Sequence, residues 1–418
     1  MRRDVAATVL AGLDPVRDRA EELYRDLHAH PELAHQEHRT AAEVARRLQD
    51  CGLEVHTGVG GTGVVGVLTN GAGPTVLLRA DMDALPVEEA TGLPYASTVT
   101  VDGTPVMHAC GHDVHVTCLL AATELLAGGT AEWAGTLVAL FQPAEEVADG
   151  ARGMVDDGLA SLVPRPDVLL GQHVLPMRAG SVGTHPGPTL AAGDSMRITV
   201  YGRGAHGSMP QSAVDPVVMA SMIVIRLQTI VARELPPDET AVLTVGSIRA
   251  GSTSNVIPDR AEIQLNIRTY DEGTRSRILE SITRIVGAEC QASRSPREPE
   301  FELFERFPLT DNDAATTRTL ADAFAAHFGD RAGDLGRWAA SEDFSDLAAA
   351  FDGVPYSYWG FGGTDPERYD RAVREGRTAE DLPANHSPDF APVLRPTLET
   401  GTEALVVAAL AWLAREST

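Results

Sequence analysis

Residues 136–146 read TLVALFQPAEE, a run of mostly apolar side chains that ends in a proline and two adjacent glutamates. An apolar run of this length is typical of a strand that is buried on both faces, in a sheet covered by helices on either side. The same pattern recurs in three other short stretches, GVVGVL (63–68), TVLLRA (75–80) and DVLLGQHV (167–174). A helical pattern, VTCLLAATELLAG (116–128), lies between two of these runs. The sequence therefore predicts an α/β layer architecture.

The chain changes character after HPGPTLAAG (185–193). The segments that follow have alternating or helical patterns, namely strands in SMRITVYGRGAH (195–206), AVLTVGSIRAG (241–251) and AEIQLNIRTY (261–270), and helices at 214–233 and 274–290. Beyond SRSPREPEFE the sequence again has the strand and helix patterns of an α/β domain, and it ends in a predicted helix at 397–415. We predict a catalytic domain with a mixed sheet and helices on both faces, made of residues 1–189 and 301–418. A smaller α+β domain is inserted at 190–300, since 418 residues exceed the usual size of a single core.

The composition excludes several classes of function. A formal charge of −25 argues against nucleic acid and anionic membranes as partners. All 34 basic residues are arginine, so chemistry that needs a lysine, such as Schiff-base formation or a P-loop, is excluded. The four cysteines are scattered without a C-x-x-C pair, which fits a reducing compartment. The apolar runs LVALF and TEALVVAALAWLA are too short or too polar to span a bilayer, and no secretory signal is evident. We therefore expect a cytoplasmic protein without a membrane partner.

The glycine-rich stretch GVGGTGVVGV (58–67) resembles a dinucleotide-binding loop. Such a loop follows a strand and opens a helix, whereas these glycines precede a strand. A turn or the entry to a hairpin is the better interpretation, and a nicotinamide-dependent oxidoreductase is disfavoured.

Residues that are typical metal ligands cluster at predicted strand ends and turns. They are Asp81 and Asp83 after TVLLRA, Cys110 and His112 in MHACGHDVH (107–115), Glu145 and Glu146 after TLVALFQPA, His173 in LLGQHV and His386 in NHSPDF. Ligand sites of α/β sheets lie beyond the carboxyl ends of the strands, so these side chains are expected to converge. In extended backbone the two glutamates would point in opposite directions, one to a metal and the other to a water as general base. The alternative interpretation, which would apply to an isolated pair of glutamates, is that both lie in a solvent-exposed loop without a catalytic role.

Seven motifs then follow one another in a recognisable order: RADMDALPVEE, MHACGHDVH, FQPAEEVADGARGM, GAHGSMP, NVIPD, SEDFS and NHSPDF. Together they resemble the motifs of the co-catalytic metallo-amidohydrolases, which include aminoacylases, carboxypeptidase G and succinyl-diaminopimelate desuccinylase. The chain most resembles the branch of hippurate hydrolases, N-acyl-amino-acid amidohydrolases and plant auxin-conjugate hydrolases. The resemblance extends over most of the chain.

This resemblance implies roles for individual residues. The metal ligands would be Cys110, His112, Glu146, His173 and His386. Glu145 would be the general base, and Asp83 would support the site. Other branches have a histidine at the position of Asp81, so a ligand role for Asp81 is in doubt. His108, Asp113 and His115 would be supports or bystanders.

The resemblance also implies a function. Two divalent cations per subunit (Zn²⁺, Mn²⁺ or Co²⁺) would serve to hydrolyse the amide bond of a small N-acyl amino acid, releasing a carboxylic acid and a free amino acid. His206 would stabilise the oxyanion across the interface of a homodimer or higher homo-oligomer, with the inserted domain as a lid. Asn255 would bind substrate, and Arg268 would pair with its carboxylate, unless it is a solvated strand arginine. A dipeptidase of the same superfamily and a non-catalytic metal-binding protein on the same scaffold are the alternatives.

Overall fold

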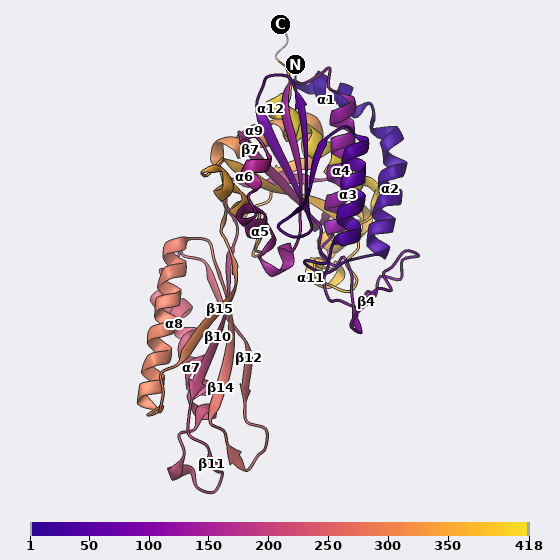
Figure 1. Ribbon diagram of the computed structural model, residues 1–418. Coiled ribbons are helices and arrows are strands. Elements are labelled where there is room, and N and C mark those ends of the chain that lie inside the picture. The colour runs from indigo at the N-terminus through magenta and orange to yellow at the C-terminus, as the bar shows by residue number, and fades with distance from the viewer. Residues whose placement is uncertain (1, 416–418) are drawn as a thin grey trace. The chain divides into compact units, whose positions relative to one another are not determined.

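The computed structural model describes residues 2–415, and their contacts divide the chain into two compact units (Figure 1). The first unit takes in the chain up to Gly187, Asp311–Arg337 and the chain from Asp343 onward. The second unit is Pro188–Thr310 together with Trp338–Glu342. The sequence placed the inserted domain at 190–300, and no pattern indicated that a short later segment would join it.

The first unit is built on a mixed eight-stranded sheet. The strand order is β1-β2-β6-β3-β7-β18-β8-β17, with parallel pairing from β6 through β3 and β7 to β18. The strands are β1 (Glu54–Val59), β2 (Gly63–Asn70), β3 (Thr75–Asp81), β6 (Gly135–Gln142), β7 (Val168–Arg178), β8 (Val182–Thr184), β17 (Ala332–Asp334) and β18 (Tyr356–Thr364). Every residue of β3 and β6 is buried, as the continuous apolar runs predicted.

The glycine-rich stretch forms a turn. β1 and β2 pair antiparallel around it, so the prediction of a hairpin rather than a nucleotide loop is confirmed. Gly60 and Gly61 have φ values of 66° and 107°, a region that favours glycine.

Helices cover both faces of this sheet. α4 and α12 contact β3, β6 and β7 on one face, and α5 contacts β6 from the other face (Figure 1). α3 packs on β1 and β2 beside α4, and α2 packs on α4 and α12. Nearly all of α4 is buried between sheet and helices, which explains its apolar sequence. The helices and short helical turns of this unit are α1 (Arg2–Leu10), α2 (Leu13–Ala29), α3 (His38–Asp50), α4 (His112–Gly128), η1 (Glu145–Val147), α5 (Gly150–Asp156), α6 (Leu159–Leu162), α9 (Ala314–Phe328), η4 (Gly329–Arg331), η5 (Phe344–Phe351), α10 (Pro366–Glu375), α11 (Thr378–Asp381) and α12 (Leu394–Leu413).

The second unit is a four-stranded antiparallel sheet in the order β12-β14-β10-β15, and α7 and α8 share a core with it. Its main elements are β10 (Ala192–Tyr201), α7 (Pro216–Thr229), η3 (Ile230–Glu234), β12 (Ala241–Ala250), β14 (Arg260–Thr269), α8 (Glu272–Ala292) and β15 (Glu300–Phe307). The remaining short elements of the described residues are β4 (Thr100–Val101), β5 (Thr104–Pro105), β9 (Gly187–Leu190), β11 (Ala205–His206), η2 (Pro210–Ser212), β13 (Val256–Ile257) and β16 (Thr310–Asn312). The predicted fold class, a mixed-sheet α/β domain with a smaller α+β domain, is confirmed.

One helical stretch among the described residues, Pro216–Glu234, is long and apolar enough by length and composition alone to cross a membrane. The helix predicted at 214–233 covers most of this stretch. In the fold it is the core helix of the second unit, where Met219, Ile223 and Leu227 are fully buried against the sheet and α8.

Candidate metal centre and active site

The candidate ligands come from four parts of the first unit. Cys110 lies two residues before α4's first residue, which is His112. Between them Gly111 has a φ of 85°, and a Cβ there would lie 2.4 Å from Val174 Cγ1. Only glycine therefore allows the chain to turn sharply enough to aim both neighbours at one place. His173 lies in β7, and the third and fourth parts are η1 and the segment before α12.

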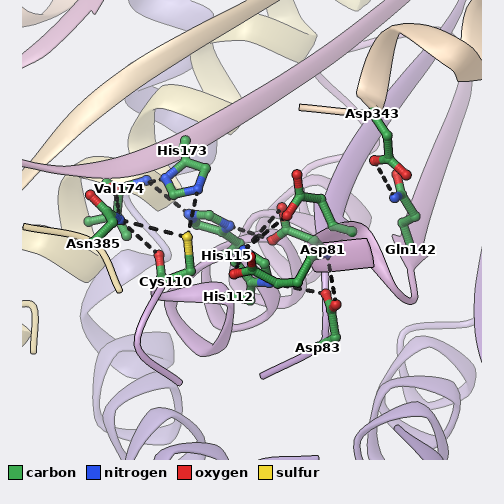
Figure 2. A network of polar contacts seen from close by, with 12 residues as sticks. Asp81, Asp83, Cys110, His112, His115, Gln142, His173, Val174, Asp343 and Asn385 are labelled. Carbon is green, nitrogen blue, oxygen red and sulfur yellow. Dashed lines mark hydrogen bonds and ion pairs between the residues drawn. The ribbon is translucent and has the colours of Figure 1, made fainter. Parts of the chain in front are cut away.

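Two groups of candidate ligands share one sulfur. Cys110, His112 and His173 have ligand atoms within 4.8 Å of one another, and so do Cys110, Glu146 and His386. The Cys110 Sγ lies 3.5 Å from Nε2 of His173, as Figure 2 shows. In the other group, Nε2 of His386 lies 3.4 Å from Oε2 of Glu146. Each group has the donor set of a transition-metal site, and a thiolate can bridge two ions.

The histidine tautomers fit metal binding. The Nδ1–H of His112 donates to Asp83 Oδ1 at 3.2 Å, and the Nδ1–H of His173 donates to the carbonyl of Val174 at 2.8 Å (Figure 2). A carboxylate or carbonyl can only accept, so the neutral form of each ring has its lone pair on Nε2. Nε2 of His173 is the atom beside the Cys110 sulfur, and Nε2 of His112 lies 3.8 Å from the Glu146 carboxylate.

Two buried polar atoms support the presence of cations. Nε2 of His112 and Oε1 of Glu146 have no hydrogen-bond partner among the described residues, although both are buried. Burial acts to lower the pKa of His112, but Asp81 and Asp83 outweigh it and raise this pKa to about 10. The surroundings therefore favour positive charge at this point, and divalent cations fit these residues.

The two adjacent glutamates do not lie in extended backbone. They form one 3-10 turn between Ala144 and Ala148, whose φ values are 51° and 55°. The expectation that the two carboxylates would point in opposite directions is wrong. Nε2 of His112 is 3.9 Å from Glu145 and 3.8 Å from Glu146, so both carboxylates face the same cluster.

Asp83 links two members of the cluster. Besides accepting from His112, its Oδ2 accepts the backbone N–H of Glu146 at 3.0 Å. Both contacts orient candidate ligands, and the supporting role that the resemblance implies for Asp83 stays a prediction.

Asp81 and His115 are hydrogen-bonded to each other. Nε2 of His115 accepts the backbone N–H of Val174 at 2.8 Å, so its proton is on Nδ1, which donates to Asp81 at 2.5 Å (Figure 2). The other oxygen of Asp81 accepts from Arg79 at 2.6 Å. Burial acts to raise the pKa of Asp81, yet His112, Arg79 and His115 hold it well below its ordinary value. Although Asp81 and His115 lie close to His112, their hydrogen-bonding atoms are already engaged.

The remaining polar residues of MHACGHDVH (107–115), Asp113 and His108, lie outside the candidate ligand groups. Asp113 accepts from His28 at 2.7 Å, and this contact ties the start of α4 to α2. His108 is buried, which lowers its pKa to about 4, and neither ring nitrogen has a hydrogen-bond partner within residues 2–415. It therefore acts as an apolar core residue here.

Sequence reasoning missed two supports. Arg79 lies in the apolar strand β3 and donates to Asp81 and Gln142. As the only charged residue in TVLLRA, it could have been predicted to have a buried partner. Asn385 donates to the carbonyl of Cys110 at 3.1 Å and to that of Val174 at 3.2 Å, and no pattern in the sequence indicates these contacts.

The other predicted residues, His206, Asn255 and Arg268, belong to the second unit and not to the cluster of the first. His206 is exposed on β11, next to the backbone of Asn255. Its Nδ1 accepts the N–H of Ser208 at 3.1 Å, which leaves the proton on Nε2. Arg268 donates to Asn266 at 3.0 Å and also to the hydroxyl of Ser341.

Comparison with known proteins identifies the family. A model described as peptidase family M20/M25/M40 matches residues 77–384. The chain belongs to this family. It is 38% identical over 330 residues to the hippurate hydrolase of Campylobacter jejuni, covering 78% of this chain and 83% of the relative. It is 38% identical over 301 residues to the N-acetyl-L-cysteine deacetylase of Bacillus subtilis, covering 72% and 70%.

A solved structure agrees with this assignment to M20. The YXEP protein of Bacillus subtilis, described as a dinuclear metal-binding peptidase of the M20 family, superposes with a TM-score of 0.75 at 29% identity. The match covers 95% of this chain and 98% of that protein. The predicted family is confirmed, and the protein is a metal-dependent hydrolase of the M20 family.

Proposed function

We propose that the protein hydrolyses the amide bond of N-acyl amino acids and releases a carboxylic acid and a free amino acid. The observation that carries this proposal is the pair of ligand groups sharing Cys110, with the carboxylate of Glu145 beside them. The names of the relatives, hippurate hydrolase and N-acetyl-L-cysteine deacetylase, support this class of substrate.

In this proposal Cys110, His112 and His173 would hold one divalent cation, and Cys110, Glu146 and His386 would hold a second. Zn²⁺, Mn²⁺ and Co²⁺ all suit this donor set. Bound there, such cations supply Lewis-acid polarisation of the scissile carbonyl and lower the pKa of water.

The chain's own residues move the protons. The Glu145 carboxylate takes a proton from the attacking water and, once protonated, passes it to the leaving nitrogen. Between these two proton transfers, the tetrahedral intermediate needs a donor for its oxyanion. We assign this to His206, whose proton is on the outward Nε2 because Nδ1 accepts from Ser208.

In this proposal Asn255 and Arg268 bind the amino-acid part of the substrate. The Arg268 guanidinium is held in one orientation by Asn266 and Ser341. A Cβ on Gly193 would lie 2.8 Å from its Nη1, so the glycine makes room for it. A pre-oriented guanidinium suits bidentate pairing with a substrate carboxylate.

We also propose that the protein is a homodimer formed by the second unit. On α7, the side chains of Val218, Met222 and Ile225 share one face and are 59%, 43% and 61% exposed. β12 is an edge strand of the same sheet and exposes Val242 and Ile248. An apolar helix face beside an open strand edge favours self-association.

The decisive variant for the proposed chemistry is Glu145→Gln, which keeps size and hydrogen bonding but cannot take a proton. We expect turnover of N-acetyl and N-benzoyl amino acids to fall by about 10²–10⁴-fold. Bound metal, measured by elemental analysis, should stay at the wild-type level. Unchanged turnover would exclude Glu145 as the base.

A substrate panel with defined metals distinguishes the alternatives. N-acetyl, N-benzoyl, long-chain acyl and indole-acetyl amino acids are compared with dipeptides that carry a free amino group. Faster turnover of the N-acyl compounds supports the proposal. Preference for dipeptides would indicate an exopeptidase, and no turnover of either set with metal bound would indicate a binding protein.

A further inference from the structure

The loop that carries Glu145 is held in an unfavourable backbone conformation. Ala144 and Ala148, on either side of the 3-10 turn, both have positive φ values, which residues with a Cβ rarely adopt. The chain then folds back on itself, because a Cβ on Gly150 would lie 1.6 Å from the carbonyl oxygen of Pro143. Strained conformations of this kind persist only where their surroundings hold them in place.

A buried carboxylate from a distant part of the chain holds this loop. Oε1 of Glu37 accepts the backbone N–H of Ala144 at 2.9 Å, and also that of His35 at 3.0 Å. Its other oxygen accepts the hydroxyl of Thr62. The Glu37 side chain is completely buried, and burial raises its pKa although these hydrogen bonds act to lower it.

The same turn of the chain contacts the far end of the loop. His35, two residues before Glu37, lies with Nε2 3.1 Å from the Asp149 carboxylate. Residues 35–37 therefore contact the loop on both sides of the 3-10 turn that bears Glu145. The Glu146 side of this turn has a separate support, since its N–H donates to Asp83.

We propose that Glu37 is a positioning residue for hydrolysis, which aims Glu145 by fixing the backbone of Ala144. Among the described residues its carboxylate bonds Ala144, His35 and Thr62, none of them a proposed metal ligand, so it acts through the residue directly before the base. The inference rests on the proposed role of Glu145. A general base must lie within hydrogen-bonding reach of its proton, and a shift of about 1 Å can cost about 10²-fold in rate.

Three substitutions at position 37 test this. Glu37→Ala removes the acceptor, and Glu37→Asp keeps the charge but withdraws the carboxylate by roughly 1.5 Å. Both should lower kcat by about 10-fold to 10²-fold, with KM and metal content close to wild type. Glu37→Gln keeps an amide oxygen for the two N–H groups and should stay within about threefold of wild-type kcat. If Glu37→Ala does not fold, Glu37→Asp still tests the proposal.

Glu32 supplies a matched control. Its carboxylate accepts the N–H groups of Arg39 and Thr40, both at 2.8 Å, at the start of the same helix that follows Glu37. Glu32→Ala therefore loosens α3 without touching the Glu145 loop. It should lower the melting temperature and leave kcat unchanged. An equal loss of kcat in Glu32→Ala and Glu37→Ala would overturn the positioning role.

Amide hydrogen exchange gives a readout that does not depend on turnover. In metal-free protein, the Ala144 N–H should exchange faster in Glu37→Ala than in wild type, and Glu32→Ala should leave it protected. Unchanged protection of Ala144 in Glu37→Ala would contradict the inference.

The outcome for Glu145→Gln separates the two proposals. If Glu145→Gln is inactive but Glu37→Ala and Glu37→Asp keep wild-type kcat, only the role of Glu37 fails. If Glu145→Gln is active, the proposed base fails, and the role of Glu37 fails with it.

Discussion

At the scale of single residues, Cys110 is the residue on which the proposed centre depends most. Among the described residues, it alone belongs both to the candidate ligand group with His173 and to the group with His386. Burial, Glu146 and Glu145 raise the pKa of its thiol well above the ordinary value. A buried thiol among carboxylates is a poor nucleophile but a suitable ligand once cations are present.

This sharing predicts unequal effects of ligand substitutions on metal content. Cys110→Ala should reduce bound metal from two ions to well below one per subunit, because both groups lose a ligand. His173→Ala should leave about one ion, since the group with Glu146 and His386 is intact. Elemental analysis after gel filtration measures this, with circular dichroism to verify folding. Equal metal loss in the two variants would contradict a bridging sulfur.

At the scale of elements, the start of α4 is fixed by neighbours far away in sequence. His28 at the end of α2 donates to Asp113 at 2.7 Å and to Glu89 at 3.1 Å. Burial acts to lower the pKa of His28, but these two carboxylates outweigh it and raise the pKa to about 10. The helix start that carries His112 is thus tied to α2 by a buried ion pair.

This ion pair predicts a stability that falls at alkaline pH. The folded-state pKa lies above the ordinary value of about 6.5, so the stabilisation by His28 is complete below pH ~6.5 and is lost as pH rises toward about 10. The titratable groups around His28 are Asp113 on α4, Glu89 and Tyr95 in the loop before β4, Tyr24 on α2 and His108.

Urea denaturation of wild type and His28→Gln at several pH values checks this prediction. The wild type should be the more stable protein at pH 7, and the difference should shrink by roughly 2 kcal/mol by pH 9. A difference that stays constant or grows over this range would show that His28 is not charged in the folded protein.

At the scale of the whole molecule, the residues of the proposed reaction are divided between two units. The cluster around Cys110 lies in the first unit, and His206 lies in the second. The proposed dimer concerns the second unit alone, through α7 and the edge strand β12.

The double variant Val218→Asp/Ile225→Asp tests that dimer. Two carboxylates placed in an apolar interface should raise the dissociation constant by roughly 10²-fold. Light scattering after gel filtration should then show monomers where wild type shows dimers. Val373→Asp is the matched control, since Val373 is 51% exposed on α10 of the first unit and should leave the dimer intact. A wild-type protein that is monomeric at micromolar concentration would exclude the proposal.

Much of the fold was predictable from local patterns. The apolar runs of β3 and β6 reflect burial on both faces, and the position of the glycines before β2 indicated a hairpin. The motif order pointed to the family. The 3-10 turn at Glu145 was not predictable, because its backbone is held by Glu37 and the close packing of Gly150 rather than by its own residues.

The sequence by itself determined the kinds of element, the family and the set of candidate metal-binding side chains, since burial periodicity and ligand chemistry are properties of the residues and their spacing. Tertiary structure alone decided which side chains meet. Glu37 and Ala144 are 107 residues apart, and Asn385 and Cys110 are 275 apart. Hydrogen bonds of this kind depend on where the sheet brings distant segments together, and no local pattern records that.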